Sequence, residues 1–76
     1  MFTPEQSRVI AQALNTQAFM NYISTHGIDP AIKIRDEIVS MDIGNVTFSS
    51  LSDTAKSVLT DALNELDTTP QALNLM

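Results

Sequence analysis

The chain contains no cysteine and no tryptophan, only two glycines, and only four basic residues. Without cysteine, disulfide bonds and thiolate metal sites are excluded. Two glycines are too few to build the Gly-rich turns that hold phosphates or dinucleotides. The four basic residues face nine acidic ones, for a net charge of −5, so the basic surface that nucleic-acid binding needs is missing. We therefore expect no metal, no cofactor and no direct contact with nucleic acid.

A chain of 76 residues allows one domain with a small core, and we treat residues 1–76 as a single helical domain. Without disulfides or a metal, a domain of this size must pack efficiently or be completed by another chain. The amino end, Met1–Glu5, lacks the basic region and apolar run of a signal peptide. That absence predicts a cytoplasmic protein.

Three helix starts can be read from capping residues followed by proline or by a capping-box residue. Thr3-Pro4 predicts a first helix that runs to about Thr25, where His26 and Gly27 suit a helix end. Asp29-Pro30 predicts a second helix to about Met41. Its main apolar row is Ala31, Ile34, Ile38 and Met41, and a second row contains Ile32 and Val39.

The third helix is expected to begin near Ser50, with Ser50 and Asp53 at capping-box spacing. A short extended segment or an ordered loop at 46–48 is expected before it, and a helical turn from Pro70 to Met76 after it. The fold class is therefore all-α, a small three-helix domain with a C-terminal helical turn. The third helix has the clearest apolar face, made of Leu51, Ala55, Val58, Leu59, Ala62, Leu63 and Leu66.

No Asp, Glu, Lys or Arg occurs between Val9 and Ile28. The length matches a membrane span of about 20 residues, but buried Gln and Asn side chains are costly in hydrocarbon, so we expect no membrane insertion. Along one stripe of this helix the polar residues Gln12 and Asn15 give way to Phe19. The change predicts a contact with another protein, most simply a second copy of the chain. The predicted interface residues are Phe19, Met20, Tyr22 and Ile23; cover by residues 46–51 or by the terminal turn is the alternative.

Few residues offer catalytic chemistry. His26 and Asp29 are close in sequence and are the one pair that resembles a general base with its orienting acid. A histidine at a helix end has a simpler explanation in the macrodipole, and no nucleophile motif accompanies it. We expect no catalytic residue and no enzymatic activity.

Four carboxylates lie on or beside the third helix and form a candidate acidic patch: Asp53, Asp61, Glu65 and Asp67. Asp61 and Glu65 are four residues apart, so two like charges share one helix face. This patch supports an alternative function, an acidic mimic of nucleic acid that occupies the basic groove of a nucleic-acid-processing enzyme. A solvated helix face is the simpler explanation.

The sequence thus predicts a small non-enzymatic adaptor, regulator or inhibitor that contacts another protein and forms a homodimer through its uncharged first helix. Its size suits a phage or bacterial accessory protein.

Overall fold

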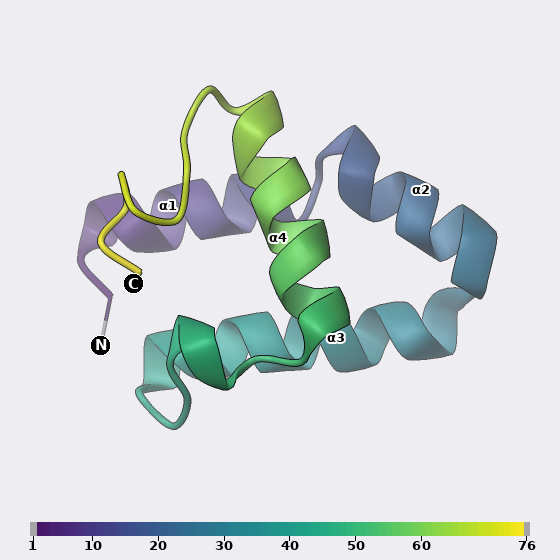
Figure 1. The fold of residues 1–76 in the computed structure, drawn as a ribbon, viewed down its shortest axis with the longest axis horizontal. Helices are drawn as coiled ribbons and strands as arrows, with labels where there is room; N and C mark the ends of the chain where they lie inside the picture. Colours follow the sequence, from purple (N-terminus) through teal and green to yellow (C-terminus); the bar gives the residue numbers. More distant parts are fainter. Residues whose placement is uncertain (1, 76) are drawn as a thin grey trace.

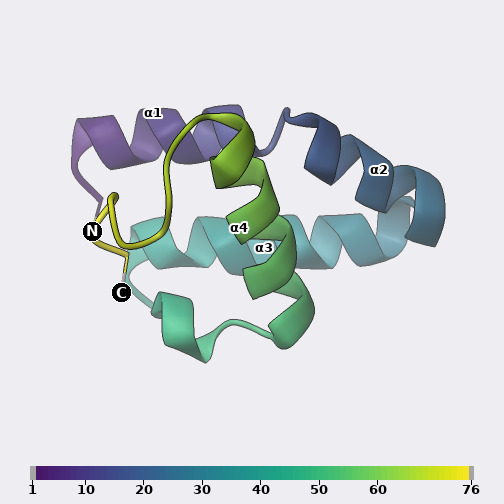
Figure 2. The ribbon, with the colours of Figure 1, turned by 45° about the horizontal axis from the view of Figure 1, so that its top comes forward.

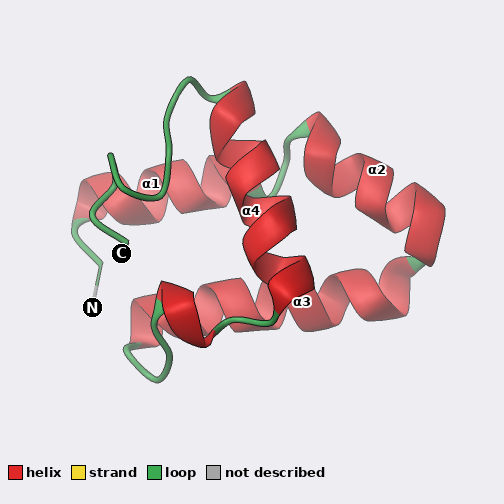
Figure 3. Cartoon of the chain, viewed as in Figure 1, coloured by secondary structure: helices red, strands yellow, loops and turns green. Residues whose placement is uncertain are grey.

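The computed structural model describes residues 2–75, and over this range the chain forms helices and loops without a strand (Figures 1 and 3). The all-α class is confirmed, but with four α-helices in place of the three expected. Helix α4 runs across α1 and α3 in both ribbon views (Figures 1 and 2). The elements are α1 (Pro4–Ala13), α2 (Gln17–His26), α3 (Ile28–Ile43), the short 3-10 helix η1 (Phe48–Ser50) and α4 (Asp53–Glu65).

The start of α1 is the capping box that the sequence predicts. The Thr3 hydroxyl accepts from the Gln6 amide at 3.1 Å, and the Gln6 side chain accepts from the Thr3 amide at 2.9 Å. Pro4 occupies the first helical position, where no amide hydrogen is needed. The Gln6 side-chain amide also donates to the carbonyl of Leu73 at 2.6 Å, so this cap fixes the C-terminal turn as well.

The prediction of a single first helix to Thr25 is wrong, because the helix is interrupted at residues 14–16. Thr16 is extended, with φ −81° and ψ 166°, and its hydroxyl donates to the carbonyl of Ala13 at 2.7 Å. This local bond satisfies a carbonyl at the end of α1 and competes with continuation of the helix. The chain then restarts as α2 in a new direction, which Figure 1 shows.

Gly27 is the whole connection between α2 and α3. Its φ of 91° ends α2 and begins α3 at Ile28, two residues before the expected Pro30. Asp29 therefore lies in the first turn of α3 and does not act as its cap. Pro30 remains compatible because amides of the first turn have no partner within the helix. At the other end α3 continues to Ile43, past the expected Met41, and Gly44 ends it in the left-handed conformation.

The segment 46–48, expected to be a short extended segment or an ordered loop, is a loop in which Thr47 is extended, and it leads into η1 at Phe48–Ser50. Helix α4 is capped by Ser52, whose hydroxyl accepts from the Ala55 amide at 3.2 Å, and not by Ser50. Glu37 of α3 accepts from the Ser52 amide at 2.9 Å and from its hydroxyl at 3.1 Å. A carboxylate of α3 therefore fixes where α4 begins.

The C-terminal segment folds back onto its own domain. Thr69 accepts from the Ala72 amide at 3.0 Å and turns occupy residues 70–74, so the expected helical turn is present as far as Asn74. Its last residue, Met76, lies outside the described range. Leu73 is buried in the core and Leu75 packs against it, so both side chains are used within the chain.

The core lies between α4 and the other helices, and the apolar faces predicted for the second and third helices are confirmed. Only Leu66 of the α4 face is merely half-buried. The buried apolar residues are Ile10, Ala13, Phe19, Ala31, Ile34, Ile38, Met41, Phe48, Leu51, Ala55, Val58, Leu59, Ala62, Leu63 and Leu73. Within residues 2–75, no helix has both the length and the apolar character required to span a membrane.

Candidate interaction surface

The residues predicted to form an interface on the first helix lie on α2, and most of them are used inside the domain. Phe19 is only 7% exposed and belongs to the core. Tyr22 and Ile23 are half-buried and pack against that core, where α2 meets α3 and α4. Met20, at 46% exposure, is the one of the four that faces solvent. The cover comes from α3 and α4, and not mainly from residues 46–51 or the terminal turn.

The acidic residues of the third predicted helix serve different purposes. Glu65 accepts from the backbone amides of Gln17 and Ala18 at 2.9 and 2.6 Å, across a separation of 48 and 47 residues. Its negative charge lies at the positive N-terminal end of α2, where amides lack partners. Asp53 is the first residue of α4, Asp61 is exposed, and Asp67 follows the helix with φ 57°. The four carboxylates are thus distributed from one end of α4 to beyond the other.

Replacing Glu65 tests its role as the cap of α2. Glu65→Gln removes the charge and one of the two acceptor oxygens, so we expect the free energy of unfolding to fall by about 1 kcal/mol. In a domain of this size that loss lowers Tm by about 4–8 °C. Asp61→Asn on the same helix removes the same charge from an exposed side chain and is the matched control. Equal melting temperatures for the two variants would contradict the capping role.

His26 lies at the C-terminal end of α2, as the sequence predicts. It is exposed in the last turn of α2, and its ring lies 4.3 Å from the ring of Tyr22, centroid to centroid, at an angle of 37°. No hydrogen bond joins His26 to Asp29 among the contacts of residues 2–75. The same range holds no group of three histidine or acidic side chains able to bind a metal ion.

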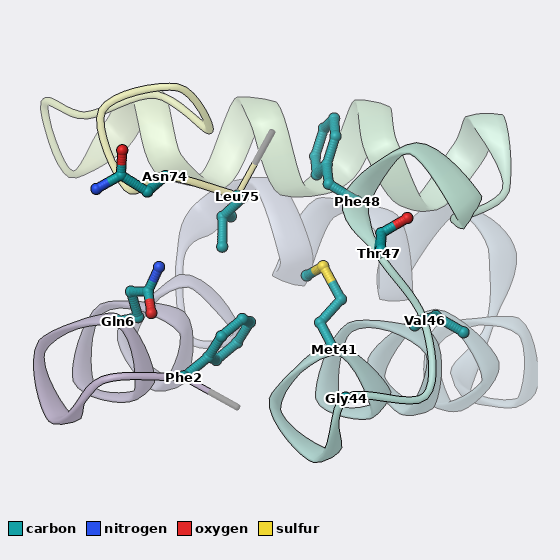
Figure 4. Close-up of a pocket in the computed structure, with 9 residues that line it drawn as sticks. All are labelled: Phe2, Gln6, Met41, Gly44, Val46, Thr47, Phe48, Asn74 and Leu75. Carbon is teal, nitrogen blue, oxygen red and sulfur yellow. The ribbon is translucent and has the colours of Figure 1, made fainter.

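A pocket of about 310 Å³ lies where the amino end, the α3–α4 connection and the C-terminal turn meet (Figure 4). Phe2, Met41 and Leu75 turn toward this space, and the polar residues of its lining are Gln6, Thr47 and Asn74. No titratable side chain lines it. The pocket is thus lined by apolar side chains and by neutral polar residues.

The exposed apolar surface lies mainly on α3. Four of the five large apolar side chains exposed on the described chain belong to this helix, and Met20 is the fifth. The four form what we call the α3 stripe: Ile28 (57% exposed), Ile32 (38%), Val39 (41%) and Ile43 (66%). The second apolar row seen in the sequence contained Ile32 and Val39. Ile28 and Ile43 were missed because the helix was expected to be shorter at both ends.

Comparison with known proteins does not assign the chain: no family model, curated protein or solved structure matches it significantly. The functional argument therefore depends on the residues and geometry of this chain.

Proposed function

We propose that this protein is a small non-enzymatic protein–protein interaction module that associates with a second copy of itself. The observation that carries the proposal is the α3 stripe, which leaves four aliphatic side chains of one helix in water on a chain of only 76 residues. Apolar side chains exposed along one face of a helix are typical of interaction sites. Among soluble proteins, closed twofold dimers are the commonest form of association.

The proposal of a non-enzymatic role is supported by the arrangement of the candidate catalytic residues. Neither the histidine nor the pocket brings together a nucleophile, a base and a stabilising donor. The acidic-mimic alternative gains no support, because Glu65 is used to cap α2 and the other three acids are spread along α4. We therefore assign the proposed function to the α3 stripe.

The proposal is tested by sedimentation equilibrium over a range of concentrations and salt. We expect the mass to rise from 8.3 kDa toward twice that value at high micromolar concentration. Each copy carries −5, so added salt should leave the association unchanged or tighten it by screening repulsion between the copies. A single-chain mass at high micromolar concentration contradicts the proposal, and so does association that weakens as salt rises.

A further inference from the structure

The α3 stripe occupies a single line along the helix. At 100° per residue, its four members fall within a sector of about 60°, on the side turned away from Ala31, Ile34 and Ile38 in the core. From Ile28 to Ile43 the stripe runs about 22 Å at 1.5 Å per residue, which is almost the whole of α3. The stripe is therefore long enough for two helices to pair along it.

The spacing of the four stripe residues is also symmetric about the centre of α3. Ile28 and Ile43 are equally far from the point between Arg35 and Asp36, and so are Ile32 and Val39. We propose that two copies of the chain pair through α3 in antiparallel orientation, with the twofold axis at this midpoint. Ile28 then lies opposite Ile43 of the second copy, and Ile32 lies opposite Val39 of the second copy. This inference rests on the proposed self-association and adds its interface, orientation and register.

The charged residues beside the twofold axis are compatible with a second copy of the chain. Arg35 and Asp36 flank the apolar stripe at its centre, one on each side, and their side chains form an exposed ion pair at 3.3 Å. Pairing two copies brings together two arginines and two aspartates, a cluster without net charge. Asp29 and Asp42 lie next to the isoleucines at the two ends of the stripe, so the pairing also brings acidic side chains to each end of the contact, and added salt should tighten it by screening their repulsion. The antiparallel orientation also places each helix end beside the oppositely charged end of the other helix.

The surface beside the stripe also has room for a side chain of the second copy. A depression of about 160 Å³ lies between α1 and α3; its wall is mainly apolar, with Val39, Ile10 and Leu14 among its residues, and Ser7 and Asp42 are its polar members. In the proposed register Ile32 of the second copy faces Val39, so an aliphatic side chain lies against this depression. Symmetry repeats the contact on the other side of the axis, as a twofold interface requires.

Because the protein has no cysteine, single substitutions report the register directly. Ile28→Cys and Ile43→Cys alter exposed positions, and equal amounts of the two variants are mixed under mild oxidation at high micromolar concentration. We expect the mixture to form covalent heterodimer at about ten times the rate at which either variant alone forms homodimer. Within one dimer, Ile28 and Ile28 of the second copy would lie about 22 Å apart, beyond the roughly 7 Å Cα separation that a disulfide spans.

Two further variants keep the outcome interpretable. Asp36→Cys lies beside the axis and should cross-link with itself rapidly, whereas Met20→Cys, exposed on α2, should cross-link slowly. Rapid homodimer formation by Ile28→Cys overturns the antiparallel register, and so does the absence of any preference for the mixture. If the wild-type mass still doubles in either case, the proposed function stands and this interface is wrong. If the wild type remains a single chain, both are wrong.

Discussion

Phe19→Asp is expected to destabilise the fold severely. The side chain of Phe19 is buried in the core between α2 and its neighbours, and only 7% of the residue is exposed. The substitution removes a large apolar group and places a carboxylate among apolar side chains, which together cost about 4 kcal/mol or more. A domain this small has a total stability of about 5–10 kcal/mol. Far-ultraviolet circular dichroism should therefore show loss of most helical signal or a steep fall in Tm.

Met20→Asp, one residue along α2, is the matched control. Met20 is largely in solvent, so the same added charge should cost about 1 kcal/mol or less and leave the helical signal intact. The pair of variants separates a core position from an exposed one on the same helix. A folded Phe19→Asp protein with native stability would contradict the position of Phe19 in the structure.

Ile28→Asp is expected to abolish self-association and to leave the fold unchanged. Ile28 is the first residue of α3, where a negative charge is favoured by the helix dipole. In the proposed dimer the new carboxylates face Ile43 of each opposite copy. A loss of about 2 kcal/mol at each of the two equivalent contacts weakens dimerisation about a thousandfold. Sedimentation should then show a single chain at concentrations where the wild type is paired.

Met20→Asp again supplies the control, since it adds an identical charge on a different surface. It should dimerise within about twofold of the wild type, because the net repulsion that it adds is screened by salt. If Met20→Asp prevents association and Ile28→Asp does not, the contact lies on α2, where the uncharged sequence first placed it.

The sequence analysis predicted the all-α class and the buried faces of α3 and α4. These followed from apolar residues repeating every three or four positions, as in Leu59, Ala62 and Leu63, and that periodicity reflects burial along a helix. The capping box of Thr3 and Gln6 was also predictable, because both of its hydrogen bonds join residues three apart.

The break between α1 and α2 was not predictable from local signals. The residues around Asn15 and Thr16 include no proline or glycine, and the cap of α2 comes from Glu65, far along the chain. A helix start fixed by a distant carboxylate leaves no mark at the start itself. Helix α4 differs, because its cap Ser52 is a local signal and Glu37 of α3 only holds that cap in place.

The prediction of one continuous helix also determined where the candidate interface was expected. With one continuous helix, Phe19 follows Asn15 along a solvent-facing stripe. Once the helix breaks at Thr16, α2 takes a new direction and Phe19 turns inward. The exposed apolar surface then lies on α3, where the weaker second row of Ile32 and Val39 was already visible.

The pairing of α3 with α3 of a second copy is tested most directly by isotope-filtered nuclear Overhauser spectroscopy on a mixture of labelled and unlabelled protein. Only contacts between copies give signals in this experiment. The account predicts cross-peaks between the methyl groups of Ile28 and Ile43 and between those of Ile32 and Val39. Cross-peaks that join Ile28 to Ile28, intermolecular contacts confined to Met20 and its neighbours, or none at all would contradict it.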